Sequence, residues 1–267
     1  MSGGRSLRTV LGSTPLLVGL LLSGCGWGSS THGSVARVPD RTEVVFLPML
    51  HGAHRGASGY SFGYLREILR EIAPDVVLVE VPPSIMARVE AASDAHESGA
   101  PMNDPWLTRW PEIFEVLLPM RRRLHYQVVP VSGLSADARR DFRAYFEAHP
   151  LGPDVGYYRR ALRAVRVMRE DDDPREEPAY ALSPAYRRLV GWPRQALSTA
   201  AEDELGEAGP RRLVHAHLEK MREAIAAHPG ERIVVAFDAA DAWYLVPRLR
   251  HLPGVHYIDA LAFDDVM

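Results

Sequence analysis

The sequence is poor in cysteine and in long apolar runs. It holds one cysteine in 267 residues, so the chain has no internal disulfide and must be stabilised by packing. Beyond residue 30, no apolar stretch reaches the roughly 20 residues that a transmembrane helix needs, and no repeat of fixed period is present. Lysine and arginine together number 31 against 34 acidic residues. This mildly acidic balance, without a long basic patch, does not favour nucleic-acid binding.

The single cysteine ends an N-terminal stretch with the features of an export signal. Arg5 and Arg8 give the stretch a basic start, residues 14–22 are mostly apolar, and Leu-Ser-Gly directly precedes Cys25. A basic start, a short apolar core and small residues at a cleavage site are typical of a secretory signal. A lone cysteine directly after Leu-Ser-Gly is typical of a bacterial lipoprotein. The alternative is an ordinary secretory signal with a chance cysteine.

The lipoprotein interpretation divides the N-terminal region into two parts. Residues 1–24 are then a signal peptide, and Cys25 is the lipid-bearing first residue of the mature chain. Residues 25–42, rich in Gly, Ser and Thr, form a flexible linker. The predicted location is the bacterial cell envelope, attached to the membrane through the N-terminal lipid. Gly26, rather than an aspartate, after the cysteine favours the periplasmic face of the outer membrane.

From residue 43 onward, short β-branched apolar runs alternate with segments whose apolar residues recur at helical spacing. The predicted strands are 43–47, 75–80, 126–131, 232–237 and 255–259, and the predicted helices are 61–73, 82–92, 107–124, 211–227 and 239–250. In the 107–124 helix, Pro111 and Pro119 place boundaries or kinks. Strand, helix and strand at this spacing form a βαβ unit, which implies parallel pairing. Pro130 argues for a sheet edge or a strand end. Residues 43–267 are therefore predicted to form one α/β domain, a mainly parallel sheet with flanking helices and a helical insertion at about 135–206.

Ionisable side chains gather where three of the predicted strands end. They follow the first, second and fourth strands: His51, His54, Glu80, Asp238 and Asp241. Ligands of open parallel sheets collect beyond the carboxyl ends of the strands. Imidazoles and carboxylates that meet there suit a divalent transition metal, and they suit general acid–base chemistry equally well.

Each of these residues also has a structural interpretation. A histidine in a glycine-rich loop can be a surface or structural residue. Asp238 can be the N-cap of the helix after its strand, and Asp241 can be an acid in the first turn of that helix. Glu80 is the strongest functional candidate, because an acid at the tip of a buried strand needs a partner.

Several segments resemble the motifs of a known family. Residues 47–51 resemble its opening strand and G-x-x-H turn, and residues 74–80 resemble its Pro-Asp-Val-Val-x-Val-Glu strand. In its second half, Met221 and residues 233–235 are similar to a helix and a Val-rich strand, and residues 238–245 stand at a second G-x-x-H motif. The chain thus resembles the TraB/PrgY/GumN/Tiki group, in the clan that holds EreA-like esterases and ChaN. The resemblance covers about 43–90 and 209–262.

The resemblance implies a metal site, since Tiki members resemble metal-dependent proteases whose two motif histidines and glutamate build that site. His51 then matches the first histidine and Glu80 the glutamate. Asp241 stands at the second histidine and would be the third ligand, with His54 as a further one. Mn, Fe, Co or Zn would suit this set, and the aspartate, a harder ligand than histidine, favours Mn or Fe.

The sequence departs from the family pattern at four positions. Pro48 and Asp238 stand where the two motifs have glycine, and Asp241 replaces a histidine. His217 falls where family members often have arginine. A glycine can allow a close backbone approach that a side chain blocks. Two replacements in one motif are also what a degenerate site would show.

Three functions follow as hypotheses. The first is a lipid-anchored, metal-dependent hydrolase, peptidase-like, in which Glu80 and His51 act on a peptide or small-molecule substrate. The second is a non-catalytic ligand- or haem-binding lipoprotein similar to ChaN, with His54 or Tyr60 as the haem ligand. The third is EreA-like esterase activity with His51 as the general base.

Overall fold

Five short apolar segments form a parallel β-sheet, as the sequence predicts. The strands are β1 (Thr42–Met49), β2 (Val76–Val79), β3 (Gln127–Pro130), β4 (Arg232–Asp238) and β5 (Val255–Ile258). Their order is β3-β2-β4-β1-β5, and every neighbouring pair is parallel. The α/β prediction is therefore confirmed. Strand β3, which ends in Pro130, lies at an edge of the sheet, where the missing backbone N–H of proline is tolerated.

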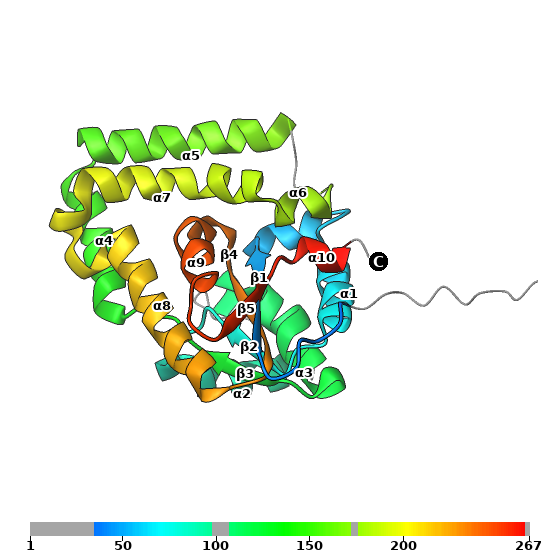
Figure 1. Ribbon diagram of the computed structural model, residues 1–267. Helices are drawn as coiled ribbons and strands as arrows, with labels where there is room; N and C mark the ends of the chain where they lie inside the picture. Colours follow the sequence, from blue (N-terminus) through cyan, green and yellow to red (C-terminus); the bar gives the residue numbers. More distant parts are fainter. Residues whose placement is uncertain (1–34, 98–106, 172–175, 265–267) are drawn as a thin grey trace, which may run out of the picture. The chain divides into compact units, whose positions relative to one another are not determined.

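The computed structural model describes residues 35–97, 107–171 and 176–264 (Figure 1). All of them belong to one unit of the chain, His32–Met267. The predicted signal peptide, Cys25 and the first part of the predicted linker lie outside the described residues. No helix within the described ranges combines the length and the apolar character that a membrane crossing requires.

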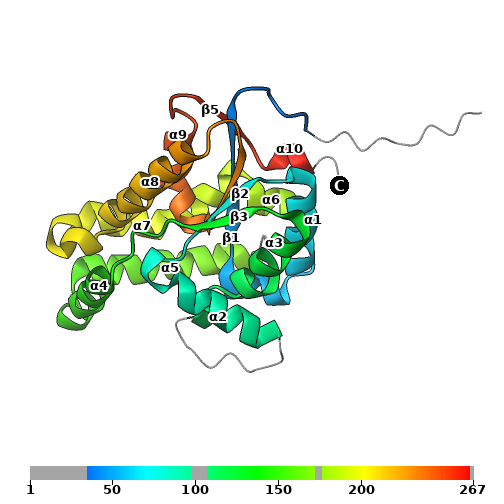
Figure 2. The ribbon, with the colours of Figure 1, turned by 90° about the horizontal axis from the view of Figure 1, so that it is seen from below.

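Helices cover both faces of the sheet. The α-helices are α1 (Phe62–Ile72), α2 (Met86–Glu97), α3 (Leu118–Leu124), α4 (Ala136–Ala148), α5 (Pro153–Asp171), α6 (Pro178–Leu182), α7 (Pro184–Leu205), α8 (Pro210–Ala227), α9 (Ala242–Leu249) and α10 (Leu261–Asp264). Short 3-10 turns are η1 (His51–Gly56), η2 (Pro83–Ile85), η3 (Leu107–Arg109), η5 (Gly206–Ala208) and η6 (Ala239–Asp241), and η4 (Ile113–Leu117) is a π-helical turn. Helices α1 and α3 lie on one side of the sheet, and α8 and α9 on the other (Figure 2).

The central strands β1, β2 and β4 are mostly apolar because both of their faces are covered. Along β1, Val45 and Leu47 pack into the core cluster that contains α1, whereas Val44 and Phe46 pack into the cluster that contains α8 and α9. This alternation is the period of two that a strand imposes on its side chains. The sheet thus has no solvent-facing side along its central strands.

Helix α1 forms where the apolar spacing and the predicted cap agree. The Ser61 hydroxyl accepts a hydrogen bond from the Tyr64 N–H, as an N-cap does. Four apolar residues at helical spacing are fully buried against the sheet: Leu65, Ile68, Leu69 and Ile72. Their burial fixes α1 against β1 and places the η1 turn at the carboxyl end of that strand.

The long connection between β3 and β4 supplies helices α4 to α8. Helices α5 and α7 lie across the carboxyl ends of the strands (Figure 1), and α7 packs against η6, which follows β4. Ser135 caps the start of α4 by accepting from the Ala138 N–H. Gly206, with a positive φ of 55°, ends α7. The inserted helices therefore stand directly over the edge of the sheet where ligands of this fold collect.

The two central strands send their connections to opposite faces of the sheet. Strand β1 leads into α1 on one face and β4 leads into α9 on the other, although β1 and β4 are neighbours. In open parallel sheets such a reversal leaves a crevice outside the carboxyl ends of the two strands. The crevice is formed here by the residues that follow Met49 and Phe237.

The opposite, amino end of the sheet holds a buried ion pair. The Arg232 Nε atom donates to Glu43 Oε2 at 2.6 Å, and both side chains are at most 3% exposed. Two further guanidinium nitrogens of Arg232 donate to the carbonyls of Ile72 and Val35, at 2.9 and 3.0 Å. The arginine thereby ties β4 to β1 and to the end of α1.

Candidate functional site

Three ionisable side chains meet at the carboxyl ends of β1, β2 and β4. They are His51, which follows β1, Glu80, which follows β2, and Asp238, which ends β4. One ligand atom of each lies within 4.8 Å of the others, so this triad could hold a metal ion. The Nε2 atom of His51 is 3.9 Å from Glu80 Oε2 and 3.6 Å from Asp238 Oδ2.

His51 is held in an uncommon backbone conformation by the turn after β1. Its φ is 52°, which is rare for a residue other than glycine. The ring Nδ1 atom lies 2.9 Å from Glu112 Oε1, a carboxylate that is 2% exposed and directly precedes the π-helical turn η4. In that hydrogen bond Nδ1 donates to the Glu112 carboxylate, which fixes the orientation of the ring. The other ring nitrogen, Nε2, then faces Glu80 and Asp238. Strained residues and π-turns are both frequent at functional sites.

The Nε2 atom of His51 is buried and has no hydrogen-bond partner among the described residues. Glu80 meanwhile accepts the backbone N–H of Asp238 at 3.1 Å. The Glu80 side chain is thereby fixed beside the histidine, although its strand is separated from β1 by β4. The triad is therefore positioned by contacts between strands.

Asp238 has two roles in the structure. Its Oδ1 atom accepts the Ala240 N–H at 2.9 Å and caps η6, as the structural interpretation of the sequence expects. Its Oδ2 atom accepts from Arg194 of α7 at 2.5 Å while it also faces His51. The same guanidinium forms an ion pair with Asp241, whose side chain is 2% exposed. Asp241, expected as a metal ligand from the family motif, is thus engaged by Arg194 in this structure.

Burial and neighbouring charges shift the pKa values of these groups. Burial lowers the pKa of His51, but the carboxylates of Glu112 and Asp238 outweigh it and raise that pKa well above its ordinary value. Burial raises the pKa of Glu80 to about 7, and His51 opposes this rise. For Asp238, burial opposes ionisation, but Arg194, His51 and the Ala240 N–H together outweigh it and hold the pKa well below its usual range. Burial raises the pKa of Asp241, against the attraction of Arg194.

Near neutral pH, the protonated and the ionised form of Glu80 are therefore both populated. A carboxyl group with a pKa near the working pH can both take and give a proton, as general acid–base chemistry requires. A group shifted by burial and placed in a crevice beside charged partners is typical of a functional site. Glu80, the strongest candidate in the sequence, has these properties in the structure.

His54 and Tyr60 lie in the core rather than at the site. The Nε2 atom of His54 accepts the Leu50 N–H at 2.8 Å, and its Nδ1 atom lies 2.9 Å from the Tyr60 carbonyl. The Tyr60 hydroxyl donates to the Pro48 carbonyl at 2.8 Å, and both side chains are at most 1% exposed. These contacts shape the glycine-rich turn that presents His51. They leave no ring nitrogen of His54 unpaired.

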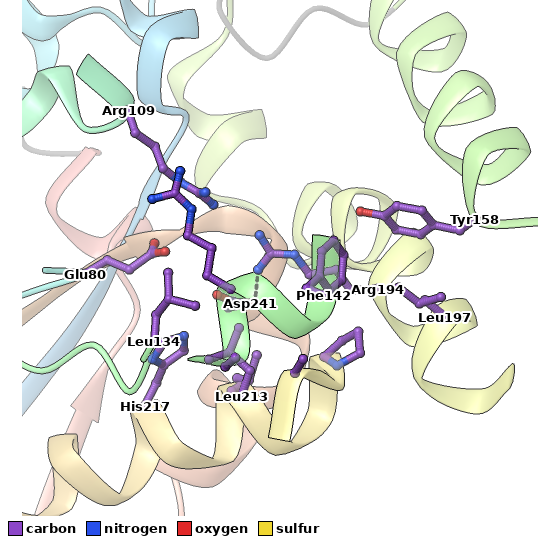
Figure 3. Close-up of a pocket in the computed structure, with 15 residues that line it drawn as sticks. Glu80, Arg109, Leu134, Phe142, Tyr158, Arg194, Leu197, Leu213, His217 and Asp241 are labelled. Carbon is purple, nitrogen blue, oxygen red and sulfur yellow. Dashed lines mark hydrogen bonds and ion pairs between the residues drawn. The ribbon is translucent and has the colours of Figure 1, made fainter. Parts of the chain in front are cut away.

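A cavity of about 190 Å³ adjoins the triad (Figure 3). Glu80, Asp241 and Arg194 form part of its wall next to the sheet, and His217 of α8 borders it. The remaining wall comes mostly from the inserted helices and is largely apolar. The site is thus an ionisable cluster at the end of the sheet with a partly open cavity beside it.

His217 is a buried neutral histidine. Its Nδ1 atom accepts the Gly133 N–H at 2.6 Å, and burial, with the charge of Arg194, lowers its pKa to about 3. Because the unfolded chain binds a proton at a pKa near 6.5, this histidine stabilises the fold above that pH. The stabilisation is lost as the pH falls from about 6.5 towards the folded pKa.

We expect the free energy of unfolding of the wild type to fall by about 2 kcal/mol between pH 7 and pH 5 because of His217. Over this range the histidine takes up a proton in the unfolded chain and stays neutral in the folded one. In His217→Asn, an amide oxygen can accept the Gly133 N–H without titrating, so the decline over this range should be smaller by that amount. Urea unfolding at the two pH values measures the difference. His215→Asn, at an exposed position of the same helix, is the control and should decline like the wild type. Equal declines in all three proteins would contradict the prediction.

Two residues of the site are absent from the sequence-based candidates. Glu112 lies in a mostly apolar stretch of the sequence. An acid among apolar neighbours indicates that its side chain is buried and paired. Arg194 gives no such signal, because an arginine in a helix is ordinarily solvated. Its role depends on the packing of α7 against η6, which the sequence pattern does not reveal.

Comparisons of the chain with protein-family models, with curated proteins and with solved structures found no match. The resemblance to the TraB/Tiki group therefore stays a prediction from the motifs. A parallel α/β sheet hosts many unrelated activities, so the fold alone does not define a function. Here the geometry of the site, rather than the fold, indicates what the protein can do.

Proposed function

We propose that the chain is a metal-dependent hydrolase whose divalent cation is held by His51, Glu80 and Asp238. The observation that carries the proposal is the buried Nε2 atom of His51, which no described residue hydrogen-bonds and which faces two carboxylates. A buried polar atom without a partner is costly, and a cation would pair it. One imidazole and two carboxylates suit Mn, Fe, Co or Zn, and the oxygen-rich set favours Mn or Fe.

The surrounding residues support such a centre. Glu112 orients the His51 ring through Nδ1, as carboxylates behind metal-bound histidines commonly do. A divalent cation at this position would polarise a carbonyl or phosphoryl oxygen of the substrate. With one carboxylate oxygen as a ligand, Glu80 would keep its other oxygen to hold or move a proton at the reacting group. The substrate would be a peptide or a small molecule that reaches the adjoining cavity.

Metal content is the direct test. We expect the purified full-length chain, reconstituted with Mn, Fe, Co or Zn, to bind about one ion per chain, as read by elemental analysis. His51→Ala should weaken binding by about 100-fold or more, because it removes the only imidazole of the set. Peptides and small esters would then be screened for hydrolysis by the loaded protein.

The matched control is His215→Ala, which removes an exposed histidine of α8 and should bind metal like the wild type. Circular dichroism establishes that both variants are folded. Failure of the wild type to bind any of the four metals would contradict the proposal, as would binding that survives His51→Ala unchanged.

A metal-independent hydrolase is the second candidate, and one observation favours it. The hydrogen-bonded pair of Glu112 and His51, with Glu80 beyond it, is an arrangement in which the histidine and Glu80 can hold and transfer a proton without a metal ion. The two candidates differ in their response to a chelator. Hydrolysis that persists after complete metal removal would favour the acid–base site over the metal centre.

The proposed enzyme would be anchored in the bacterial cell envelope through lipid on Cys25, as its N-terminal sequence suggests. Haem binding is the weaker proposal. Both of its candidate ligands, His54 and Tyr60, are buried and bonded to backbone groups, so neither is presented to a cofactor.

A further inference from the structure

The cavity beside the triad combines charged and apolar lining. Arg109 of η3 and Arg139 of α4 reach it from separate elements, and its other walls include Phe142, Leu197 and Leu213. Figure 3 shows Arg109 extending toward the same space as the Glu80 carboxylate. A space that offers guanidinium groups beside an apolar surface fits a molecule with one anionic end and an apolar body.

The charges that line the cavity favour an anion. Asp241, one of the two lining acids, is neutralised by Arg194. The other acid, Glu80, accepts the backbone N–H of Asp238. Three guanidinium groups, those of Arg109, Arg139 and Arg194, therefore line the cavity beside two acids. Arg109 has no carboxylate partner among the described residues, and it lines the same cavity as Arg139. Guanidinium groups that line one cavity can donate charge-assisted hydrogen bonds to the same oxyanion.

We propose that Arg109 and Arg139 bind the oxyanion, a carboxylate or a phosphate monoester, of a substrate whose apolar part fills the cavity against Phe142 and Leu197. The planar guanidinium fork matches both kinds of oxyanion. This inference rests on the proposed function, because it places the substrate beside Glu80. The inference adds the class of substrate, a small molecule with one anionic group and an otherwise apolar body.

Calorimetric titration of the full-length chain tests this assignment with three probes. They are 3-phenylpropanoate, phenyl phosphate and the neutral 3-phenylpropanamide. We expect at least one anion to bind about tenfold or more tightly than the amide, because a charge-assisted hydrogen bond is lost with the charge. Arg109→Gln and Arg139→Gln should each weaken that anion by about tenfold and leave the amide unaffected.

Arg163→Gln is the matched control, since Arg163 is an exposed arginine of α5 that does not line the cavity. It should bind all three probes like the wild type. Arg109 is itself exposed, so its variant is expected to fold even where Arg139→Gln does not. Equal binding of the amide and both anions would overturn the proposal, as would anion binding that neither cavity variant weakens.

The outcome is separable from that of the metal proposal. His51→Ala, measured without metal, should retain the anion preference, because neither arginine contacts the triad histidine. If the anion preference appears only with metal and neither arginine variant weakens it, the metal ion rather than the arginines binds the anion. That result would overturn this inference. Retained anion binding by a chain that takes up no metal would leave the anion site standing while the metal centre fails.

Discussion

Replacing Arg194 with methionine is expected to destabilise the fold and, at the same time, to strengthen metal binding. The guanidinium pairs with Asp238 and Asp241, whose side chains are 16% and 2% exposed. Without it, the two carboxylates and Glu80 repel one another in a largely buried site. Removing one partner of a buried ion pair costs about 3–5 kcal/mol of unfolding free energy. Arg194 is itself 24% exposed, so we expect the lower end of that range.

The same substitution removes a positive charge from beside the proposed cation site. Asp238 Oδ2 would then no longer be shared between Arg194 and the cation, and we expect Mn²⁺ affinity to rise about tenfold. Saturating Mn²⁺ should then restore about 3 kcal/mol of stability. Urea unfolding with and without Mn²⁺ measures both effects. Arg188→Met, at an exposed position of the same helix, should change neither. Unchanged or weaker Mn²⁺ binding in Arg194→Met would contradict the proposed site.

The second large effect is expected at the opposite end of the sheet. Glu43→Gln removes the charge that pairs with Arg232, and both side chains are at most 3% exposed. The guanidinium then stays buried without a carboxylate beside it, which costs about 3–5 kcal/mol of unfolding free energy. Chemical denaturation of the purified chain measures this loss. Metal binding at the carboxyl end should be unchanged, because the two clusters lie at opposite ends of β4.

A double-mutant cycle separates the ion pair from simple packing. Glu43→Gln combined with Arg232→Met should lose less stability than the sum of the two single changes, because neither residue is then left as an unpaired charge. Arg37→Gln is the exposed control: its ion pair with Asp75 is 48% and 37% exposed, and it should cost under about 1 kcal/mol. A strictly additive cycle would contradict the assigned coupling.

The sheet was predictable because its signal is local. Each strand is a short β-branched apolar run, and β1, β2 and β4 are wholly or almost wholly buried, as parallel strands under two helical layers must be. Pro130 located the edge strand for an equally local reason, its missing N–H. The candidate residues His51, Glu80 and Asp238 could be named from the same logic, since the ends of parallel strands share one edge.

The remaining parts of the site depend on contacts between distant segments. The region 107–124 was predicted as a helix with boundaries or kinks at its prolines, but it forms η3, a π-turn and α3. That irregular path turns Glu112 toward His51, 61 residues earlier in the chain. Arg194 reaches Asp238 across 44 residues. The spacing of apolar residues predicts which face of a helix is buried. It does not predict that an arginine of that helix contacts the end of a particular strand.

The sheet and the inserted helices supply different parts of the site, and this affects how proteins with this architecture can diversify. The proposed metal ligands follow β1 and β2 or end β4, whereas Arg139, Phe142 and Leu197 of the cavity come from the helices between β3 and β4. Changes in that one connection can therefore alter which molecules enter without moving the reactive groups. Related chains built on the same sheet would be expected to share a chemistry while differing in substrate, in the way that interchangeable loops vary specificity on a fixed scaffold.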